Sequence, residues 1–148
     1  MLVGQYPLSL DEKGRLSVPA AVRQALREDY APDEGGVVLT KFFEHCLVVY
    51  PLPVWRDIEG QLQSLPNDPA SRAFLRQFCA SAVVCKLDRQ GRVLIPAGLR
   101  QYAGIEAEAL MIGMMRKLEL WSPPRWEAYE ETATAQFDTN AHLMQLRL

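Results

Sequence analysis

The feature that most constrains the fold of this 148-residue chain is an internal repeat. The segment "LDEKGRLSVPAAVRQ", residues 10–24, returns as "LDRQGRVLIPAGLRQ", residues 87–101. Eight of the fifteen positions are identical, and four others exchange apolar residues or Ala for Gly. Because a unit of about 70 residues would be only marginally stable alone, the repeat favours two units that pack on each other.

Each copy of the repeat indicates the same order of elements: strand, turn, strand, short helix, strand, strand and helix. Apolar runs typical of strands follow each copy, at Val37–Thr40, Cys46–Tyr50, Ala109–Gly113 and Lys117–Trp121. A proline shortly before a tryptophan then predicts the start of a helix at Pro53 and at Pro124. We therefore expect an α+β fold that is mainly β, with short helices.

The connection between the copies is predicted to be helical. Residues 66–69, with two prolines, interrupt the chain, and Ser71 is expected to cap a helix over residues 72–80. Arg72 and Arg76 lie four residues apart and share one face of that helix. The segment from Phe137 to Leu148 is only weakly amphipathic, and its pattern indicates no role.

The repeated Asp-x-x-Gly-Arg motif is typical of a tight turn between strands. Gly14 permits a positive φ at low cost, and Asp11 can accept bonds from backbone N–H groups two or three residues later. The same carboxylate can orient Arg15 by a charge-assisted hydrogen bond. After the turn, Pro19 predicts an extended step and then a short helix over residues 20–26. The residues alone leave two interpretations open. The aspartate–arginine pair could only stabilise the turn, or the aspartate could hold an exposed arginine in position for a ligand.

The charge pattern adds one observation to a net charge of −2. Residues 72–100 contain six basic side chains and one acidic one, net +5, whereas residues 1–71 are net −4 and residues 101–148 net −3. A local basic segment favours an anion-binding face, and ordinary solvated arginines are the alternative. No run of 18 apolar residues predicts a membrane span, and we expect no signal peptide.

The cysteines and histidines predict neither a disulfide nor a metal site. Cys46, Cys79 and Cys85 are an odd number at unrelated spacings, which favours reduced thiols in the core. His45 beside Cys46 is the nearest approach to a metal-binding pair, and no second pair accompanies it. We therefore expect no metal ion and no cofactor.

An enzyme remains the remote alternative on sequence grounds. Asp11 and Asp88 could form a carboxylate pair, and Cys85 could be a nucleophile. Neither has the usual partners, because the chain has two histidines, no glycine-rich phosphate loop and no nucleophile motif. The sequence favours a protein that is not an enzyme.

The tandem motifs "LDEKGRLSVPAAVR" and "LDRQGRVLIPAGLR" resemble the paired motifs of the MraZ family, whose two repeats belong to the SpoVT-AbrB class of DNA-binding domain. The resemblance extends over residues 1–127. It includes the early Gly4, "YPLPVW", the arginine-bearing connecting helix and "LELW". One such motif would be weak evidence, whereas two in tandem, each followed by an apolar-Pro step and a short helix, are specific.

The resemblance implies a fold of two AbrB-like halves in a pseudo-twofold arrangement that form a compact β-barrel-like core. The first repeat would then span residues 5–53 and the second residues 82–125. A helical connection over residues 54–81 would join them, and residues 126–148 would form a C-terminal helix or tail.

The resemblance also implies a cytoplasmic, nucleoid-associated transcription regulator. Proteins of this family bind double-stranded DNA at repeated sites upstream of their own gene, usually repress the division and cell-wall gene cluster, and assemble as rings. AbrB-like units also occur in antitoxins, which usually pair one unit with a toxin-binding tail. Two units in one chain make that alternative weaker.

The family's DNA contacts would fall on Asp11, Arg15, Asp88 and Arg92. Lys13 and Arg89 supply further basic groups in the two turns, and Arg72 and Arg76 are further candidate contacts, whereas Glu12 is an unfavourable neighbour for phosphate. An arginine fork suits this role because it can bridge guanine O6 and N7 or grip a phosphate.

Overall fold

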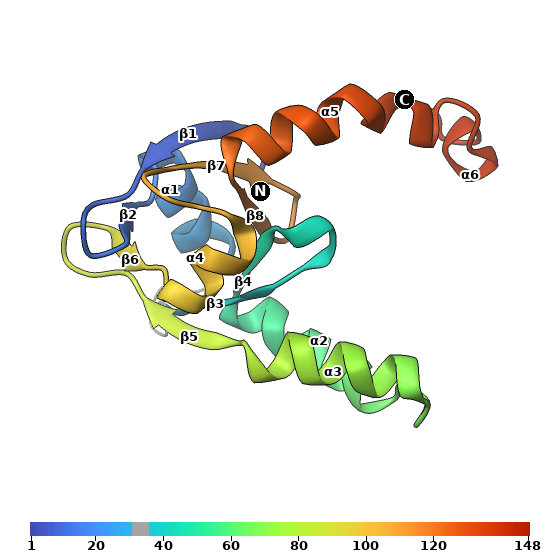
Figure 1. Ribbon diagram of the computed structural model, residues 1–148, viewed down its shortest axis with the longest axis horizontal. Helices are drawn as coiled ribbons and strands as arrows, with labels where there is room; N and C mark the ends of the chain where they lie inside the picture. Colours follow the sequence, from blue (N-terminus) through green and yellow to red (C-terminus); the bar gives the residue numbers. More distant parts are fainter. Residues whose placement is uncertain (31–35) are drawn as a thin grey trace.

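The computed structural model describes residues 1–30 and 36–148, and it confirms the predicted order of elements (Figure 1). The first repeat contains β1 (Gln5–Ser9), β2 (Arg15–Ser17), α1 (Ala20–Asp29), β3 (Gly36–Lys41), β4 (Leu47–Pro51) and α2 (Leu52–Gln63). The second contains β5 (Val83–Lys86), β6 (Arg92–Leu94), α4 (Ala97–Ala103), β7 (Glu108–Gly113), β8 (Leu118–Trp121) and α5 (Pro123–Phe137). Helix α3 (Pro69–Ala80) connects them, and α6 (Ala141–Met144) follows α5.

The two repeats exchange their first strands. The main sheet is antiparallel and has the order β1-β7-β8-β4-β3-β5, so β1 pairs with a strand of the second repeat and β5 with a strand of the first. A separate two-stranded ribbon joins β2 to β6. The order of the main sheet reads the same from either end when the repeats are interchanged, which is the expected pseudo-twofold arrangement. The four-segment division of the chain stays a prediction.

The core is compact, as expected, and the main sheet that contributes to it is not closed into a true barrel. Strands β1 and β5 form opposite edges of the main sheet and do not pair with each other. Closure would need these two edges to meet, and the short β2–β6 ribbon instead packs over one face. The two repeats contribute equally to the core at and around this ribbon. Three of its buried residues come from each repeat: Leu16, Val18 and Val22 from the first, and Val93, Ile95 and Leu99 from the second.

Both faces of the four central strands, β3, β4, β7 and β8, are covered, which explains why these strands are mostly apolar, whereas the edge strands β1 and β5 are partly exposed. In β4, Leu47 and Val49 face the core beneath α1 and α4, whereas Val48 and Tyr50 face α2 and α3. On that second side, α5 covers the part of the sheet formed by β7 and β8. The protein therefore has helices on two sides, and the turns that flank the β2–β6 ribbon lie at one end of it.

The start of α3 and the end of α1 differ from the sequence expectations. Helix α3 begins at Pro69, and its N-cap is Asp68, whose side chain accepts the backbone N–H of Ser71 at 2.8 Å. The prediction that Ser71 caps this helix is therefore wrong, because a carboxylate directly before a proline provides the earlier cap. Helix α1 continues three residues past the expected end at residue 26.

All three cysteines are free thiols, but they are not all in the core. Cys46 is buried and Cys85 is partly buried, whereas Cys79 is exposed on α3, so the expectation of a core thiol is wrong for Cys79. The neighbouring Phe78 is the buried residue of that helix, and successive helical residues point about 100° apart. None of the helices within residues 1–30 and 36–148 has the length and apolar character of a membrane span.

Candidate nucleic-acid interface

A single carboxylate holds the first motif turn, residues 11–15. Oδ1 of Asp11 accepts the backbone N–H groups of Lys13 at 3.0 Å and Arg15 at 2.9 Å. Oδ2 accepts the side-chain Nε–H of Arg15 at 2.6 Å. Gly14 has a φ of +82°, which a residue with a Cβ rarely adopts. The aspartate therefore orients the arginine, as the sequence predicted.

The second motif turn, residues 88–92, repeats this geometry. Asp88 accepts the backbone N–H groups of Gln90 and Arg92, each at 2.9 Å, and the Nε–H of Arg92 at 2.8 Å. Gly91 has a φ of +74°. Two separate segments thus build the same rigid support for an arginine.

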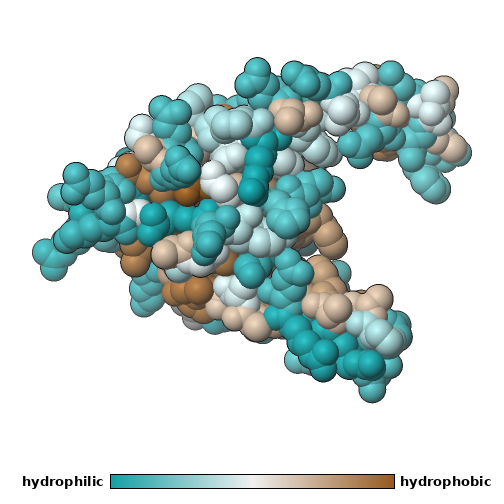
Figure 2. Space-filling view, viewed as in Figure 1, coloured by the Kyte–Doolittle hydropathy of each residue, from teal (hydrophilic) through white to brown (hydrophobic). Residues whose placement is uncertain are grey.

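The β2–β6 ribbon brings the two turns together. Its register places Ser17 opposite Arg92, and Arg15 opposite Leu94. Each turn also accepts a backbone bond from the other repeat: Val18 donates to Gly91, and Ile95 donates to Gly14, both at 2.9 Å. The turns consequently lie side by side at one end of the molecule (Figure 1). Figure 2 shows hydrophilic side chains over that end.

Arg15 and Arg92 keep most of their donor capacity for a ligand. Their side chains are 33% and 27% exposed, and within the described residues only Nε of each guanidinium has a protein acceptor. Lys13 and Arg89 are exposed beside them. Because the aspartates fix the arginines in advance, a bound phosphate or guanine would need to order little of the side chain.

The aspartates of both turns are expected to be charged at neutral pH. The hydrogen bond from the backbone N–H of Arg15 lowers the pKa of Asp11 below its ordinary 3.8, and that from Arg92 lowers the pKa of Asp88 in the same way. A lowered pKa stabilises the folded protein above 3.8, and this contribution is lost as the pH falls through the lowered pKa.

We therefore predict that the melting temperature of the wild type falls more steeply with acid than that of an Asp11→Asn, Asp88→Asn variant. Asparagine keeps an acceptor oxygen but has no carboxylate to protonate. Thermal denaturation between about pH 5 and pH 3 measures the difference. Parallel curves for the two proteins would show that the carboxylates do not stabilise the turns.

Arg23 and Arg100, which occupy equivalent positions in the two repeats, cover the opposite turns. A Cβ atom at Gly14 would lie 2.8 Å from the guanidinium carbon of Arg100, and one at Gly91 would lie 2.8 Å from Nη1 of Arg23. The sequence prediction of site residues missed both arginines. The two repeats have arginine at this same position, and this identity could have indicated a shared role. The sequence pattern does not show, however, that each helix packs on the turn of the other repeat.

The structure separates Arg72 and Arg76 from the turns. Both lie on α3, which extends away from the turns beyond β5 (Figure 1). Nη1 of Arg72 donates to the side-chain oxygen of Asn67 at 3.1 Å. The basic segment of residues 72–100 therefore does not form one continuous face, because β5 and then α3 extend away from the turns.

The geometry does not favour the enzymatic alternatives. Each of the two aspartates is engaged by its own turn rather than shared with the other. Burial raises the pKa of the Cys85 thiol, which disfavours the nucleophilic thiolate at neutral pH.

Comparison with known proteins agrees with this architecture. A family model described as "MraZ protein, putative antitoxin-like" matches residues 1–77 and again residues 78–148. The chain is 43% identical to the protein named Transcriptional regulator MraZ of Thermoanaerobacter sp. (strain X514), with 100% of both chains covered. It is 40% identical to the protein of that name from Moorella thermoacetica, covering 97% of this chain and 96% of the relative. The corresponding protein of Thermomicrobium roseum is 41% identical, with 92% of each chain covered.

Each half of the chain matches the same family model, and each contributes one turn in which an aspartate holds an arginine. Together with identities of 40% or more along nearly the whole length of these relatives, this shows that the chain belongs to the MraZ family.

Proposed function

We propose that this protein is a DNA-binding transcriptional regulator, and that the two motif turns are its contact surface. The observation that carries the proposal is the pair of turns itself: two partly exposed arginines, each held by an aspartate, lie side by side at one end of the molecule. The names of the relatives, which are transcriptional regulators, support the same function.

The proposed target is a set of direct repeats upstream of the protein's own gene, where binding would repress an operon for division and cell-wall synthesis. The proposed active form is a ring of protomers in the cytoplasm, associated with the nucleoid. A single pair of turns makes few contacts with DNA. A ring would compensate for this, because it raises the effective concentration of further turns near adjacent DNA sites. Once one protomer is bound, its neighbours reach adjacent repeats without a new diffusional encounter.

Footprinting of the purified protein on its own upstream DNA tests this proposal directly. We expect several evenly spaced protected sites, and a reporter driven by the same DNA should become more active when the gene is deleted. Uniform weak protection of any DNA would contradict sequence-specific regulation, and lower reporter activity on deletion would indicate an activator.

We predict that DNA binding weakens steeply as salt rises. Each phosphate that a Lys or Arg neutralises contributes about 0.9 to the slope of log affinity against log salt concentration. Fluorescence anisotropy with labelled operator DNA at a series of KCl concentrations gives this slope. An affinity that does not change with salt would contradict contacts between the turns and phosphates.

The same measurement tests the proposal that Arg72 and Arg76 contact DNA. A variant with both changed to Ala should lower the slope by about 2 if each neutralises a phosphate. Because α3 extends away from the turns, such contacts would require a DNA path that reaches beyond the turns. An unchanged slope would remove these two arginines from the interface.

We also predict an assembly well above a dimer at micromolar concentration. Light scattering coupled to size exclusion should give a mass that is a multiple of the 16.7 kDa protomer. A stable 16.7 kDa species that still binds operator DNA would contradict the ring.

An antitoxin role is the second candidate, because the family model is itself described as antitoxin-like. One surface that a partner protein could contact is the C-terminal segment, where Leu143, Met144 and Leu146 are exposed. A neighbouring gene for a small toxin, and a complex between the two products, would favour this function.

A further inference from the structure

Two hollows lie at equivalent places in the two repeats, each between a helix of one repeat and the motif turn of the other. The first has a volume of about 310 Å³ and lies between α1 and the second turn. The second lies between α4 and the first turn. Their walls correspond at Arg23 and Arg100, and at the two motif aspartates.

The two hollows differ in charge. At the repeat spacing of 77 residues, Arg27 of the first hollow corresponds to Gly104, and Arg89 corresponds to Glu12 of the second. The second hollow also contains Glu106. Among the described lining residues, the first hollow therefore has three arginines around one aspartate that its own turn already engages. The second has one arginine among three carboxylates.

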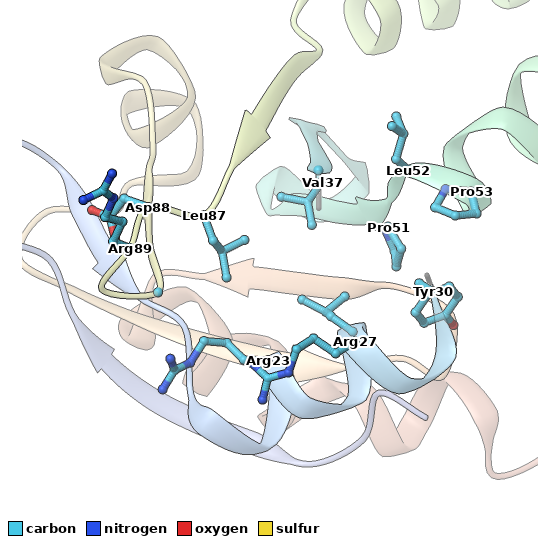
Figure 3. Close-up of a pocket in the computed structure, with 13 residues that line it drawn as sticks. Arg23, Arg27, Tyr30, Val37, Pro51, Leu52, Pro53, Leu87, Asp88 and Arg89 are labelled. Carbon is cyan, nitrogen blue, oxygen red and sulfur yellow. The ribbon is translucent and has the colours of Figure 1, made fainter. Parts of the chain in front are cut away.

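The first hollow, which we call the α1 cavity, also has an apolar wall. Leu26, Tyr30, Val37, Pro51 and Leu87 contribute to its lining. Figure 3 shows Arg23 and Arg27 extending beside each other from α1, with Leu87 and Val37 across the cavity from that helix. Arg89 stands at the turn, with its guanidinium directed away from the apolar wall in this conformation. A concave apolar site with a few convergent charged groups is the usual form of a small-molecule site.

Arg23 is incompletely satisfied by the protein. Nε of Arg100 donates to the carbonyl oxygen of Ile95 at 3.0 Å, whereas Nε of Arg23 is buried and has no acceptor among the described residues. A buried donor without an acceptor costs free energy. Because this Nε is covered by the protein, an anionic ligand in the first hollow would meet the outer part of the Arg23 guanidinium and the two other arginines, not Nε itself.

We propose that the α1 cavity binds a small organic anion, with a phosphate or carboxylate at the arginines and an apolar or aromatic body against Tyr30 and Leu87. Its occupancy would weaken DNA binding, because the ligand neutralises arginines beside the second motif turn and restricts Arg89. This regulatory part rests on the proposed DNA-binding function, whereas ligand binding itself does not. Linkage requires that DNA weaken ligand binding by the same factor.

Titration of the full-length protein, without DNA, tests the site. Adenosine 5′-monophosphate is the probe. Adenosine, which lacks the phosphate, and inorganic phosphate, which lacks the aromatic body, are the two comparison ligands. The binding of each is measured by calorimetry and by amide chemical shifts. We expect the nucleotide to bind at least about tenfold more tightly than either comparison, since each loses one class of contact. The shifts should centre on Tyr30, Leu87 and Gly91. No nucleotide binding, or shifts centred elsewhere, would overturn the proposal.

Phosphate that binds as tightly as the nucleotide would also overturn it. In that case the arginines would form a simple phosphate site of the kind that a DNA backbone fills.

A matched pair of variants assigns the charge requirement. Arg27→Gln should weaken nucleotide binding by about tenfold, the effect of one charge-assisted hydrogen bond. Glu106→Gln, in the corresponding hollow, should leave it unchanged. Both residues are exposed, and melting curves confirm that each variant is folded. Equal effects of the two changes would show a non-specific response to net charge and would reject the α1 cavity as the site.

Operator binding in the presence of the nucleotide tests the regulatory step separately. In the wild type, saturating nucleotide should reduce DNA affinity, and in Arg27→Gln the same concentration should have a much smaller effect. Nucleotide bound in the cavity with unchanged DNA affinity would overturn the regulation. If the protein bound no DNA at all, the proposed function would fail while the titration would still decide the cavity.

Discussion

Replacing either Arg15 or Arg92 with Ala is expected to remove most of the operator affinity and to leave the protein folded. Each guanidinium has one nitrogen bound to its aspartate, and its side chain is partly exposed at the end of the molecule. Loss of one base-reading arginine typically costs about 1–3 kcal/mol. When several protomers bind together, this cost is repeated in each of them. We expect Arg15→Ala to be the more damaging change, because Lys13 shares its turn.

Two controls separate DNA contact from turn stability. Arg116→Ala also breaks an exposed arginine–aspartate pair, in which Nη2 of Arg116 lies 2.6 Å from Oδ2 of Asp57, but that pair lies outside the motif turns. It should leave DNA affinity unchanged. Arg15→Lys keeps the charge and loses the planar fork, so partial retention of affinity would indicate phosphate contact rather than base reading. An Arg15→Ala protein with a lowered melting temperature but normal operator affinity would show that the motif only stabilises the turn.

Replacing Leu16 with Ala should destabilise both repeats at once. Leu16 is fully buried in the core that α1, α4 and the β2–β6 ribbon share. Removing such a side chain costs about 2–5 kcal/mol. For a chain of this size, that lowers the melting temperature by roughly 2–4 °C per kcal/mol. Because β1 and β5 are exchanged between the repeats, we expect one cooperative transition at the lower temperature rather than selective melting of the first repeat.

The matched control for this prediction is Leu94→Ala, in the partner strand of the same ribbon. Leu94 is 52% exposed, so its truncation should change the free energy of unfolding by less than about 0.5 kcal/mol. Calorimetry of both variants, at a concentration that preserves the assembly state, measures the two effects. Two separate transitions in Leu16→Ala would mean that the repeats are independent domains.

The sequence by itself determined the features that depend on near neighbours along the chain. The order of elements follows from apolar runs, prolines and glycines, and the turn geometry follows from an aspartate and an arginine four residues apart. Such contacts form within a few residues, so the residue types are enough to predict them. The repeat also indicated that each half would be only marginally stable alone, and the shared core agrees with this.

Only the tertiary structure decided which strands pair. Strand β1 pairs with β7 of the second repeat. Its sequence pattern would suit pairing with β2 equally well, so the pattern does not predict which strand is its partner. The same limit explains why the sheet proved open, and why the basic residues of α3 lie away from the turns. The placement of Arg23 over Gly91, and of Arg100 over Gly14, also depends on this exchange. Pairings between distant segments are chosen by the packing of the whole core, and no local pattern contains that information.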